Sequence, residues 1–295
     1  MSEMIHSKND ENTIGLLMRT GFRRLEEAGI ENAFGEARDI MLHLLECQPV
    51  KLFLMEEEPA SEDLKLDYMS IIEERTKHIP LQYLLGETCF MGYDFLCREN
   101  VLIPRFDTEN LVEAALDAAS SMEKKNLRVL DMCTGTGCIG ISYFLERKKE
   151  GFDDKVTLVD ISEYAIELAK DNAEKLSADV EIVRSDLFSG LHEEKFDMIL
   201  SNPPYIPTIE CETLMEEVKD YEPRLALDGD DDGLKFYRNI ISGMKPYLQD
   251  KAYVIFEIGC DQYEAVKSML NEAGYTDVKC IKDLSGLDRC VVCRI

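Results

Sequence analysis

Residues 129–140 read Val129-Leu130-Asp131-Met132-Cys133-Thr134-Gly135-Thr136-Gly137-Cys138-Ile139-Gly140 and combine an apolar strand, a glycine turn and the start of a helix. Gly135 and Gly137 allow the backbone to turn tightly and to approach a ligand closely. Asp160 ends the next predicted strand, where its carboxylate can accept hydrogen bonds from both hydroxyls of a ribose. The stretch therefore predicts a strand-turn-helix unit that binds a nucleoside-containing ligand.

From residue 127 onward, short β-branched runs alternate with longer helical stripes. Strands are predicted at 128–132, 155–160, 180–184, 196–201, 252–258, 277–282 and 289–294. Helices are predicted at 138–149, 163–176, 233–244 and 261–273, and a further helix is predicted before this region, at 111–121. This alternation is typical of an α/β fold with a mostly parallel sheet and helices on both of its faces. Such folds bind ligands beyond the carboxyl ends of the strands, where the strand order reverses.

The N-terminal part has a different pattern. Residues 1–85 carry helical stripes of apolar residues and predict a small all-α domain, either a substrate-gripping bundle or a stabilising extension. Residues 86–105 mix turn residues with short apolar runs and predict a β-hairpin linker. Residues 106–295 then form the predicted α/β domain.

Asn202-Pro203-Pro204-Tyr205 follows the buried-strand run Phe196-Asp197-Met198-Ile199-Leu200, with only Ser201 between them. The Asn202 side chain offers a neutral oxygen acceptor, and the prolines fix the backbone so that the Pro203 carbonyl can point the same way. Tyr205 adds a flat face. Such a site suits a planar, conjugated –NH2 group and predicts methylation of an amide or of an aminated base. The alternative is a plain strand-to-loop stop, because Pro-Pro is a common chain breaker.

The glycine turn also fits the dinucleotide fingerprint Gly135-x-Gly137-x-x-Gly140, with an acid about twenty residues further on. An NAD-dependent oxidoreductase is therefore a rival. Against it, the charge of Asp131 would repel a pyrophosphate but suits a cationic sulfonium or its amino group. Together with the Asn-Pro-Pro-Tyr segment, this electrostatic argument favours S-adenosylmethionine over NAD.

Composition and charge favour a globular protein and argue against direct binding of nucleic acid. The chain has 45% hydrophobic and 31% charged residues, which is typical of a globular protein. Its formal net charge of −26 argues against direct binding of nucleic acid, which draws on clusters of Lys and Arg. We find no apolar run of membrane-spanning length and no signal-peptide pattern in the start Met1-Ser2-Glu3-Met4-Ile5-His6-Ser7-Lys8, so we expect a cytoplasmic protein.

No metal site is predicted. The ten cysteines have irregular spacings, and Cys290-Val291-Val292-Cys293 lies in a strand pattern that would turn the two thiols to opposite faces. The run Asp228-Gly229-Asp230-Asp231-Asp232-Gly233 begins like a calcium loop, but its twelfth position is Asn239 instead of Glu. We interpret it as an acidic turn before a helix. The four histidines are scattered and show no ligand spacing.

With these motifs placed, the chain resembles the peptide chain release factor N(5)-glutamine methyltransferases, which are class I S-adenosylmethionine-dependent methyltransferases. The similarity covers nearly the whole chain. Besides the two motifs above, it rests on Pro80-Leu81-Gln82-Tyr83-Leu84-Leu85-Gly86, Leu102-Ile103-Pro104-Arg105-Phe106-Asp107-Thr108-Glu109, Ser185-Asp186-Leu187-Phe188, Tyr221-Glu222-Pro223-Arg224-Leu225-Ala226-Leu227 and Phe256-Glu257-Ile258-Gly259.

The resemblance implies a helical substrate-binding domain, a hairpin linker and a seven-stranded, Rossmann-like methyltransferase sheet. It implies S-adenosyl-L-methionine as cofactor and class 1 peptide chain release factors as partners, with the glutamine of their Gly-Gly-Gln motif as target. By position it implies the following cofactor residues: Asp131, Cys133, Thr134, Gly135, Thr136, Gly137, Asp160, Asp186, Leu187 and Asn202. The implied substrate-binding residues are Arg105, Glu109, Asn202, Pro203, Pro204 and Tyr205, of which Asn202, Pro203 and Tyr205 would be catalytic.

Three positions depart from the family pattern. Cys133 stands where the family often has the first glycine of the turn, so this residue must accept a backbone angle that glycine finds easier, or the turn differs. Phe106-Asp107 replaces the common Pro-Glu beside Arg105. Leu187 stands where some members have an aromatic residue, so an aliphatic side chain would pack against adenine.

Two further alternatives stay open. A nucleic-acid methyltransferase acting on the exocyclic amine of adenine or guanine would meet the same local geometry at Asn202, although the acidic charge argues against it. A non-catalytic S-adenosylmethionine-binding regulator is the alternative outside enzymes, and the intact Asn-Pro-Pro-Tyr segment argues against that.

Overall fold

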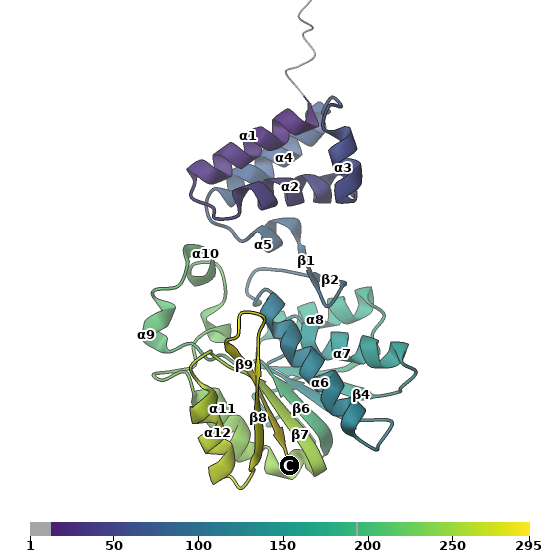
Figure 1. Cartoon of the computed structure of the whole chain (residues 1–295), viewed down its shortest axis with the longest axis vertical. Helices are drawn as coiled ribbons and strands as arrows, with labels where there is room; N and C mark the ends of the chain where they lie inside the picture. Colours follow the sequence, from purple (N-terminus) through teal and green to yellow (C-terminus); the bar gives the residue numbers. More distant parts are fainter. Residues whose placement is uncertain (1–12, 193) are drawn as a thin grey trace, which may run out of the picture. The chain divides into compact units, whose positions relative to one another are not determined.

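The computed structural model describes residues 13–192 and 194–295. It divides into two compact units, one that ends at Gly86 and one that spans Glu87–Ile295 (Figure 1). The N-terminal residues 1–8, examined above for a signal peptide, lie outside the described residues. Within the described ranges, no helix combines the length and apolar character that crossing a membrane requires.

The first unit is built from helices alone among its described residues. They are α1 (Ile14–Glu27), α2 (Ala33–Leu44), α3 (Pro49–Met55), α4 (Glu62–Arg75) and α5 (Leu81–Leu85). The side chains of Thr13 and Ser61 accept hydrogen bonds from backbone N–H groups in the first turns of α1 and α4, which explains where these helices begin. Pro49 is the first residue of α3, a position where the missing N–H costs nothing.

The core of this unit contains the predicted stripe residues, with Leu25, Ile40, Met41, Tyr68 and Ile72 fully buried. A buried ion pair joins two helices beside this core. Arg75 donates to Glu36 through Nε at 2.5 Å and through Nη2 at 3.1 Å. Because the Arg75 side chain is only 4% exposed, it depends on this partner more than a surface arginine would.

This pair yields a stability prediction with a control on the same helix. We expect Glu36→Ala to lower the free energy of unfolding by about 2 kcal/mol, because it leaves a buried guanidinium with less compensating charge. Asp39, also on α2, pairs with Arg38, whose side chain is 49% exposed. Asp39→Ala should therefore change stability by less than about 0.5 kcal/mol. Chemical denaturation followed by circular dichroism compares the variants, and equal losses would contradict the prediction.

The second unit begins with a hairpin and continues into a single seven-stranded sheet. The hairpin strands are β1 (Glu87–Phe90) and β2 (Tyr93–Leu96). The sheet strands are β3 (Arg128–Met132), β4 (Lys155–Asp160), β5 (Glu181–Arg184), β6 (Phe196–Ser201), β7 (Leu248–Glu257), β8 (Asp277–Lys282) and β9 (Asp288–Arg294). The predicted fold class is confirmed, and all seven predicted strands are present, although β7 begins earlier than expected, at Leu248.

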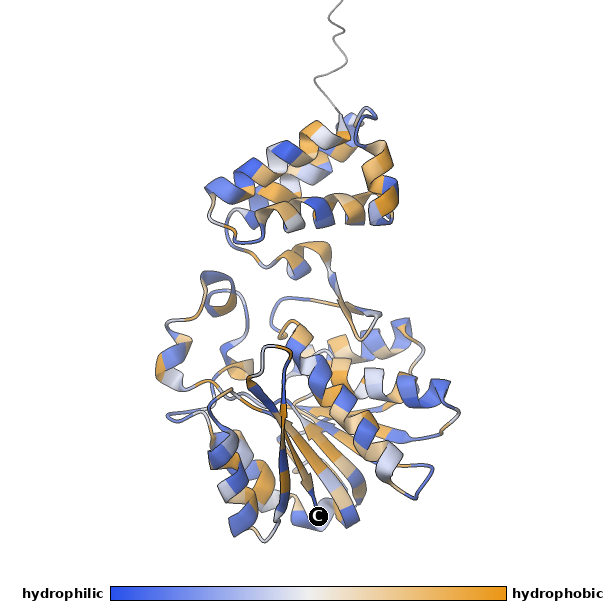
Figure 2. Cartoon of the chain, in the orientation of Figure 1, coloured by the Kyte–Doolittle hydropathy of each residue, from blue (hydrophilic) through white to orange (hydrophobic). Residues whose placement is uncertain are grey.

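Helices cover both faces of this sheet. One face is covered by α6 (Glu109–Ser121), α7 (Cys138–Lys149) and α8 (Glu163–Lys175), and the other by α11 (Lys235–Gly243) and α12 (Tyr263–Glu272). The short helices α9 (Thr208–Cys211) and α10 (Glu216–Lys219) lie to one side of the sheet (Figure 1), and 3-10 helices occur at Phe106–Thr108, Arg224–Ala226 and Lys245–Tyr247. Successive strand residues enter different cores: Val129 packs with α6, α7 and α8, whereas Leu130 packs with α11 and α12. The inner strands β3, β4 and β6 are accordingly buried along almost their whole length. The edge strand β8 instead alternates between exposed and half-buried residues, and much of it is blue in Figure 2.

The same alternation places the two thiols of β9 apart. Cys290 belongs to the core beneath α6 and α7, and Cys293 belongs to the core beneath α11 and α12. Both are fully buried, and burial raises the pKa of the Cys293 thiol to about 12. The pair therefore lies on opposite faces, as the strand pattern predicts.

The order of the strands determines where a ligand can bind. The order is β5-β4-β3-β6-β7-β9-β8, so the chain runs outward from β3 in one direction and returns to β6 on its other side. β3 and β6 are parallel neighbours, with Met132 opposite Ser201 at their carboxyl ends. The glycine turn after β3 and Asn202 after β6 consequently leave the sheet side by side, at the switch point of the topology.

Candidate functional site

A cavity of about 350 Å³ lies beyond these strand ends. Its lining includes ten of the residues predicted for the site: Arg105, Cys133, Thr134, Gly135, Thr136, Asp160, Asp186, Leu187, Asn202 and Pro204. The other predicted residues, namely Glu109, Asp131, Gly137, Pro203 and Tyr205, are not part of this lining. The cavity brings together segments from the ends of β3, β4, β5 and β6.

The backbone of the predicted glycine turn is left-handed at both glycines. Gly135 and Gly137 have φ angles of 56° and 83°, and a Cβ on Gly137 would lie 2.8 Å from a methyl of Ile141. Cys133 has a φ of 61°, so the cysteine adopts the angle that the family's usual glycine finds easier. The turn therefore keeps its backbone shape although Cys133 replaces the usual glycine.

Asp131 holds this turn from beneath. Its Oδ2 accepts hydrogen bonds from the Thr134 hydroxyl and from the Gly140 backbone N–H, the latter at 2.9 Å. Its side chain is fully buried, and burial raises its pKa to about 7. Oδ1 has no hydrogen-bond partner among the described residues. The carboxyl therefore supports the backbone of the turn, and its action on a bound ligand stays a prediction.

Asp160 joins the turn to the end of β4. Its Oδ2 accepts from the Gly135 N–H and its Oδ1 from the Ser162 N–H, both at 2.9 Å. Burial raises the pKa of this carboxyl, whereas the two backbone hydrogen bonds favour the charged form. Each oxygen can accept a further hydrogen bond, so the carboxylate can still bind the hydroxyl groups of a ligand in the cavity.

The end of β5 supplies a third wall. The Ser185 hydroxyl donates to the Leu187 carbonyl and accepts from the Gly190 N–H, which closes a tight loop. Leu187 has a φ of 48° and faces the cavity beside Asp186. An aliphatic side chain thus stands where some family members have an aromatic one, so the side chain at position 187 is apolar beside the polar Ser185 and Asp186.

The segment after β6 approaches the same cavity. The Asn202 amide donates through Nδ2 to the Thr108 hydroxyl at 3.3 Å. The Tyr205 hydroxyl donates to Glu257 Oε1 at 3.3 Å, and its backbone carbonyl accepts from Gln262 Nε2 at 2.8 Å. Asn202 and Tyr205 are therefore held from behind by other parts of the unit, which limits their freedom to reorient.

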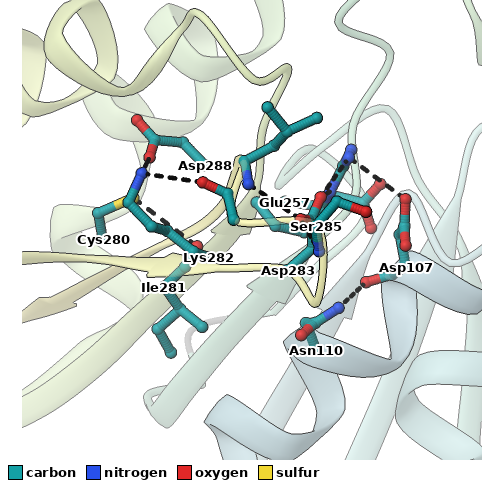
Figure 3. Close-up of polar contacts among 12 residues, drawn as sticks. Asp107, Asn110, Glu257, Cys280, Ile281, Lys282, Asp283, Ser285 and Asp288 are labelled. Atoms are coloured by element: carbon teal, nitrogen blue, oxygen red, sulfur yellow. Dashed lines mark hydrogen bonds and ion pairs between the residues drawn. The ribbon is translucent and has the colours of Figure 1, made fainter.

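Glu257, the last residue of β7, lies within this support. Its side chain is 2% exposed. Burial raises its pKa to about 7, against the opposing effects of Thr108, Arg289 and Tyr205. Arg289 itself pairs with Asp107 at 3.3 Å and with Asp283 at 3.0 Å. Figure 3 shows Asp107, Glu257 and Asp283 close together at this place. Asp107, a departure from the family pattern, thus has a partner of its own.

Two other predicted residues form contacts elsewhere. Arg105 pairs with Glu222, whose side chain is 1% exposed, and so connects the irregular segment before the 3-10 helix Phe106–Thr108 with the segment that precedes Pro223. Glu109 accepts a hydrogen bond from the Met91 N–H at 2.6 Å. This contact ties the first residue of α6 to the turn of the hairpin, and a substrate-binding role for Glu109 stays a prediction.

The acids of the 228–233 run have partners within the protein. Asp228 pairs with Arg224 at 3.1 Å, Asp230 with Lys235 at 2.7 Å and Asp232 with Arg238 at 2.8 Å. These ion pairs and the hydrogen bond from the Leu234 N–H to Asp232 hold the turn that leads into α11. No group of three or more potential metal ligands occurs in the described part of the chain.

Sequence reasoning missed the residues that support the site from behind, namely Thr108, Ser201, Glu257 and Gln262. Ser201 donates to the Met132 carbonyl at 2.7 Å and so links the ends of β6 and β3. Glu257 carries the one signal that could have been used. It follows the largely apolar run 252–256 of β7, and an acid buried at the end of such a run must find a partner or change its pKa. Thr108 and Gln262 carry no comparable signal.

Comparison with known proteins identifies matching domain families and relatives of this chain. Residues 17–86 match the model of the PrmC N-terminal domain, and residues 109–229 match that of the methyltransferase small domain. The chain is 39% identical over 271 residues to a release factor glutamine methyltransferase of Geobacter sulfurreducens, covering 92% of this chain and 93% of the relative. A protein of the same name from Clostridium botulinum is 38% identical over 284 residues, covering 94% and 98%.

A solved structure agrees at the level of fold. The hMettl16 catalytic domain, in complex with the MAT2A 3'UTR hairpin 6, superimposes with a TM-score of 0.55 at 16% identity. The match covers 79% of this chain and 82% of that one. At this identity the likeness supports the methyltransferase fold and nothing about the substrate.

Proposed function

The chain belongs to the release factor glutamine methyltransferase family, and from this premise we propose the donor, the acceptor atom and the residues that bring them together. The reaction proposed is transfer of a methyl group from S-adenosylmethionine to the side-chain amide nitrogen of the glutamine in the Gly-Gly-Gln motif of class 1 release factors. The observation that carries the proposal is the convergence of the glycine turn and Asn202 on one cavity at the switch point.

The cavity fits S-adenosylmethionine in size and chemistry. Its volume of about 350 Å³ lies within the range of small-molecule sites. The Asp160 carboxylate suits the ribose hydroxyls, Leu187 and Asp186 suit the adenine, and the left-handed turn lets backbone approach the methionine part. When bound, S-adenosylmethionine supplies an electrophilic methyl group on a positively charged sulfur.

The task of the protein is then placement of a weak nucleophile. The lone pair of a carboxamide nitrogen is delocalised into its carbonyl, so attack requires a fixed orientation of the amide. The Asn202 Oδ1 and the Pro203 carbonyl would accept the two amide hydrogens and stabilise the positive charge that develops on the nitrogen. As the nitrogen–carbon bond forms, the sulfur–carbon bond breaks, the neutral thioether S-adenosylhomocysteine leaves, and the methylated nitrogen then releases one hydrogen as a proton to water. Tyr205 packs against the amide plane. A neutral asparagine is preferable to a carboxylate, which could form a tight resting pair with the sulfonium.

We also propose that the helical unit binds the release factor. Support comes from α3, which leaves the side chains of Val50, Phe53 and Leu54 largely exposed. Large apolar side chains gathered on one short helix are typical of a protein-binding surface. The strongly acidic chain is better suited to a protein than to a nucleic-acid partner.

A labelled-methyl transfer assay tests the proposed reaction. The enzyme is incubated with methyl-labelled S-adenosylmethionine and, in parallel, with a class 1 release factor, the same factor with its motif glutamine replaced by alanine, DNA and RNA. We expect label only in the unmodified factor, with mass spectrometry placing the methyl on the glutamine side chain. Label in nucleic acid, or equal label in the factor without the glutamine, would contradict the proposal.

A further inference from the structure

A chain of buried polar side chains stands behind Asn202. The Asn202 Nδ2 donates to the Thr108 hydroxyl at 3.3 Å, across a sequence separation of 94 residues. Thr108 ends the 3-10 helix Phe106–Thr108 and is 2% exposed, while it also lines the cavity. The contact therefore lies in a region with little water, where the choice of partner for each polar atom matters.

Glu257 decides which role the Thr108 hydroxyl can play. Its Oε1 accepts a hydrogen bond from the Tyr205 hydroxyl at 3.3 Å, whereas its Oε2 is buried and has no hydrogen-bond partner among the described residues. The Thr108 hydroxyl lies near this carboxyl and favours its charged form, which opposes the rise in pKa that burial causes. A hydroxyl has one hydrogen to donate. Once that hydrogen is directed at Glu257, the Thr108 oxygen is left as an acceptor, and the group that it faces must be a donor.

If the Thr108 oxygen can only accept a hydrogen bond, this restricts the orientation of the Asn202 amide. Rotation of this amide by a half-turn exchanges its oxygen and its nitrogen without changing its shape. With Nδ2 engaged by Thr108, the oxygen Oδ1 is the atom left to meet a substrate. We propose that Thr108, oriented by Glu257, is a positioning residue that keeps the Asn202 oxygen turned toward the glutamine amide. This inference rests on the proposed function and deepens it.

Valine and serine at position 108 separate the hydroxyl from the shape of the side chain. Valine keeps the volume but removes the acceptor, so the amide nitrogen of Asn202 would turn toward the cavity, where water can bind it. To return the Asn202 oxygen to the cavity side, the variant must give up about one hydrogen bond to water. The free energy of such a bond corresponds to about a tenfold change, so we expect kcat of Thr108→Val to fall about tenfold. Thr108→Ser keeps the hydroxyl and should restore most of the rate. Affinity for S-adenosylmethionine, measured by calorimetry, should change little in both variants.

A double-mutant cycle tests whether Thr108 acts through Asn202. If it does, adding Thr108→Val to Asn202→Ala leaves the residual rate nearly unchanged, because the group that it orients is already gone. A full tenfold further loss in that background would overturn the inference. So would a Thr108→Val variant that is as active as the wild type, or a Thr108→Ser variant that is as impaired as Thr108→Val.

Glu257→Gln provides a second arm in case the valine variant does not fold. Its amide group can donate to the Thr108 oxygen and compete there with Asn202, so kcat should fall while cofactor affinity is kept. Unchanged kcat in Glu257→Gln would overturn the inference. Wild-type enzyme that does not label the release factor would instead overturn the proposed function, and the inference with it. The two failures are thus distinguishable.

Discussion

Asn202→Ala is expected to lower kcat on the release factor by about 10²–10³-fold, which corresponds to about 2–4 kcal/mol of transition-state stabilisation. This is the effect typical of removing one preorganised hydrogen-bonding group that acts on developing charge. The Asn202 side chain is already held through Thr108 before any substrate arrives, so its loss removes an oriented acceptor. Initial rates at saturating concentrations of both substrates measure the effect.

The control for this variant is Asn271→Ala, which removes the same side chain from an exposed position on α12. It should retain the wild-type rate. Calorimetry with S-adenosylmethionine should show little change in affinity for Asn202→Ala. If cofactor affinity and kcat fell by the same factor, Asn202 would be a cofactor residue and the proposed grip on the glutamine would be wrong.

Asp160→Ala is expected to weaken S-adenosylmethionine binding about 100-fold, since it removes charge-assisted hydrogen bonds to two hydroxyls from a buried site. The variant also releases the Gly135 N–H, which shapes the turn beside the ligand. Asp160→Asn should bind weakly as well. Both carboxylate oxygens accept from backbone N–H groups, so an amide must turn its own N–H toward one of those donors.

Calorimetric titration with S-adenosylmethionine gives the dissociation constant of each variant directly. Glu163→Ala is a matched control, because Glu163 is an acid in the first turn of α8 with a side chain 70% exposed. Its affinity should equal that of the wild type. Wild-type affinity in Asp160→Ala would contradict the assignment of this carboxylate to the ribose.

The elements of the sheet were predictable because each is encoded locally. Met198, Ile199 and Leu200 are apolar at successive positions, as a strand covered on both faces requires, and the structure buries all six residues of β6. Short helices were harder to predict. α9 and α10 have four residues each, too few to show a helical period, and their backbone depends on surrounding contacts.

Some features of the site could be predicted from local sequence, whereas the contacts that support it could not. The glycine turn and Asn202 follow neighbouring strands, so the switch-point rule predicts that they share a cavity. The partners of Asn202 and Tyr205 could not be predicted. Thr108 lies 94 residues before Asn202, and Glu257 lies 52 residues after Tyr205. No local pattern connects positions so far apart.

The amino-acid sequence by itself determined the alternation of strands and helices, the left-handed turn and the presence of a neutral acceptor after β6. These features depend on side-chain periodicity and on backbone angles, which act within a few residues. The tertiary structure alone decided that the Thr108 hydroxyl and the Glu257 carboxyl meet behind Asn202. The physical reason is that a hydrogen bond between distant residues exists only after packing of the sheet has brought their strands and loops together and has excluded water around them.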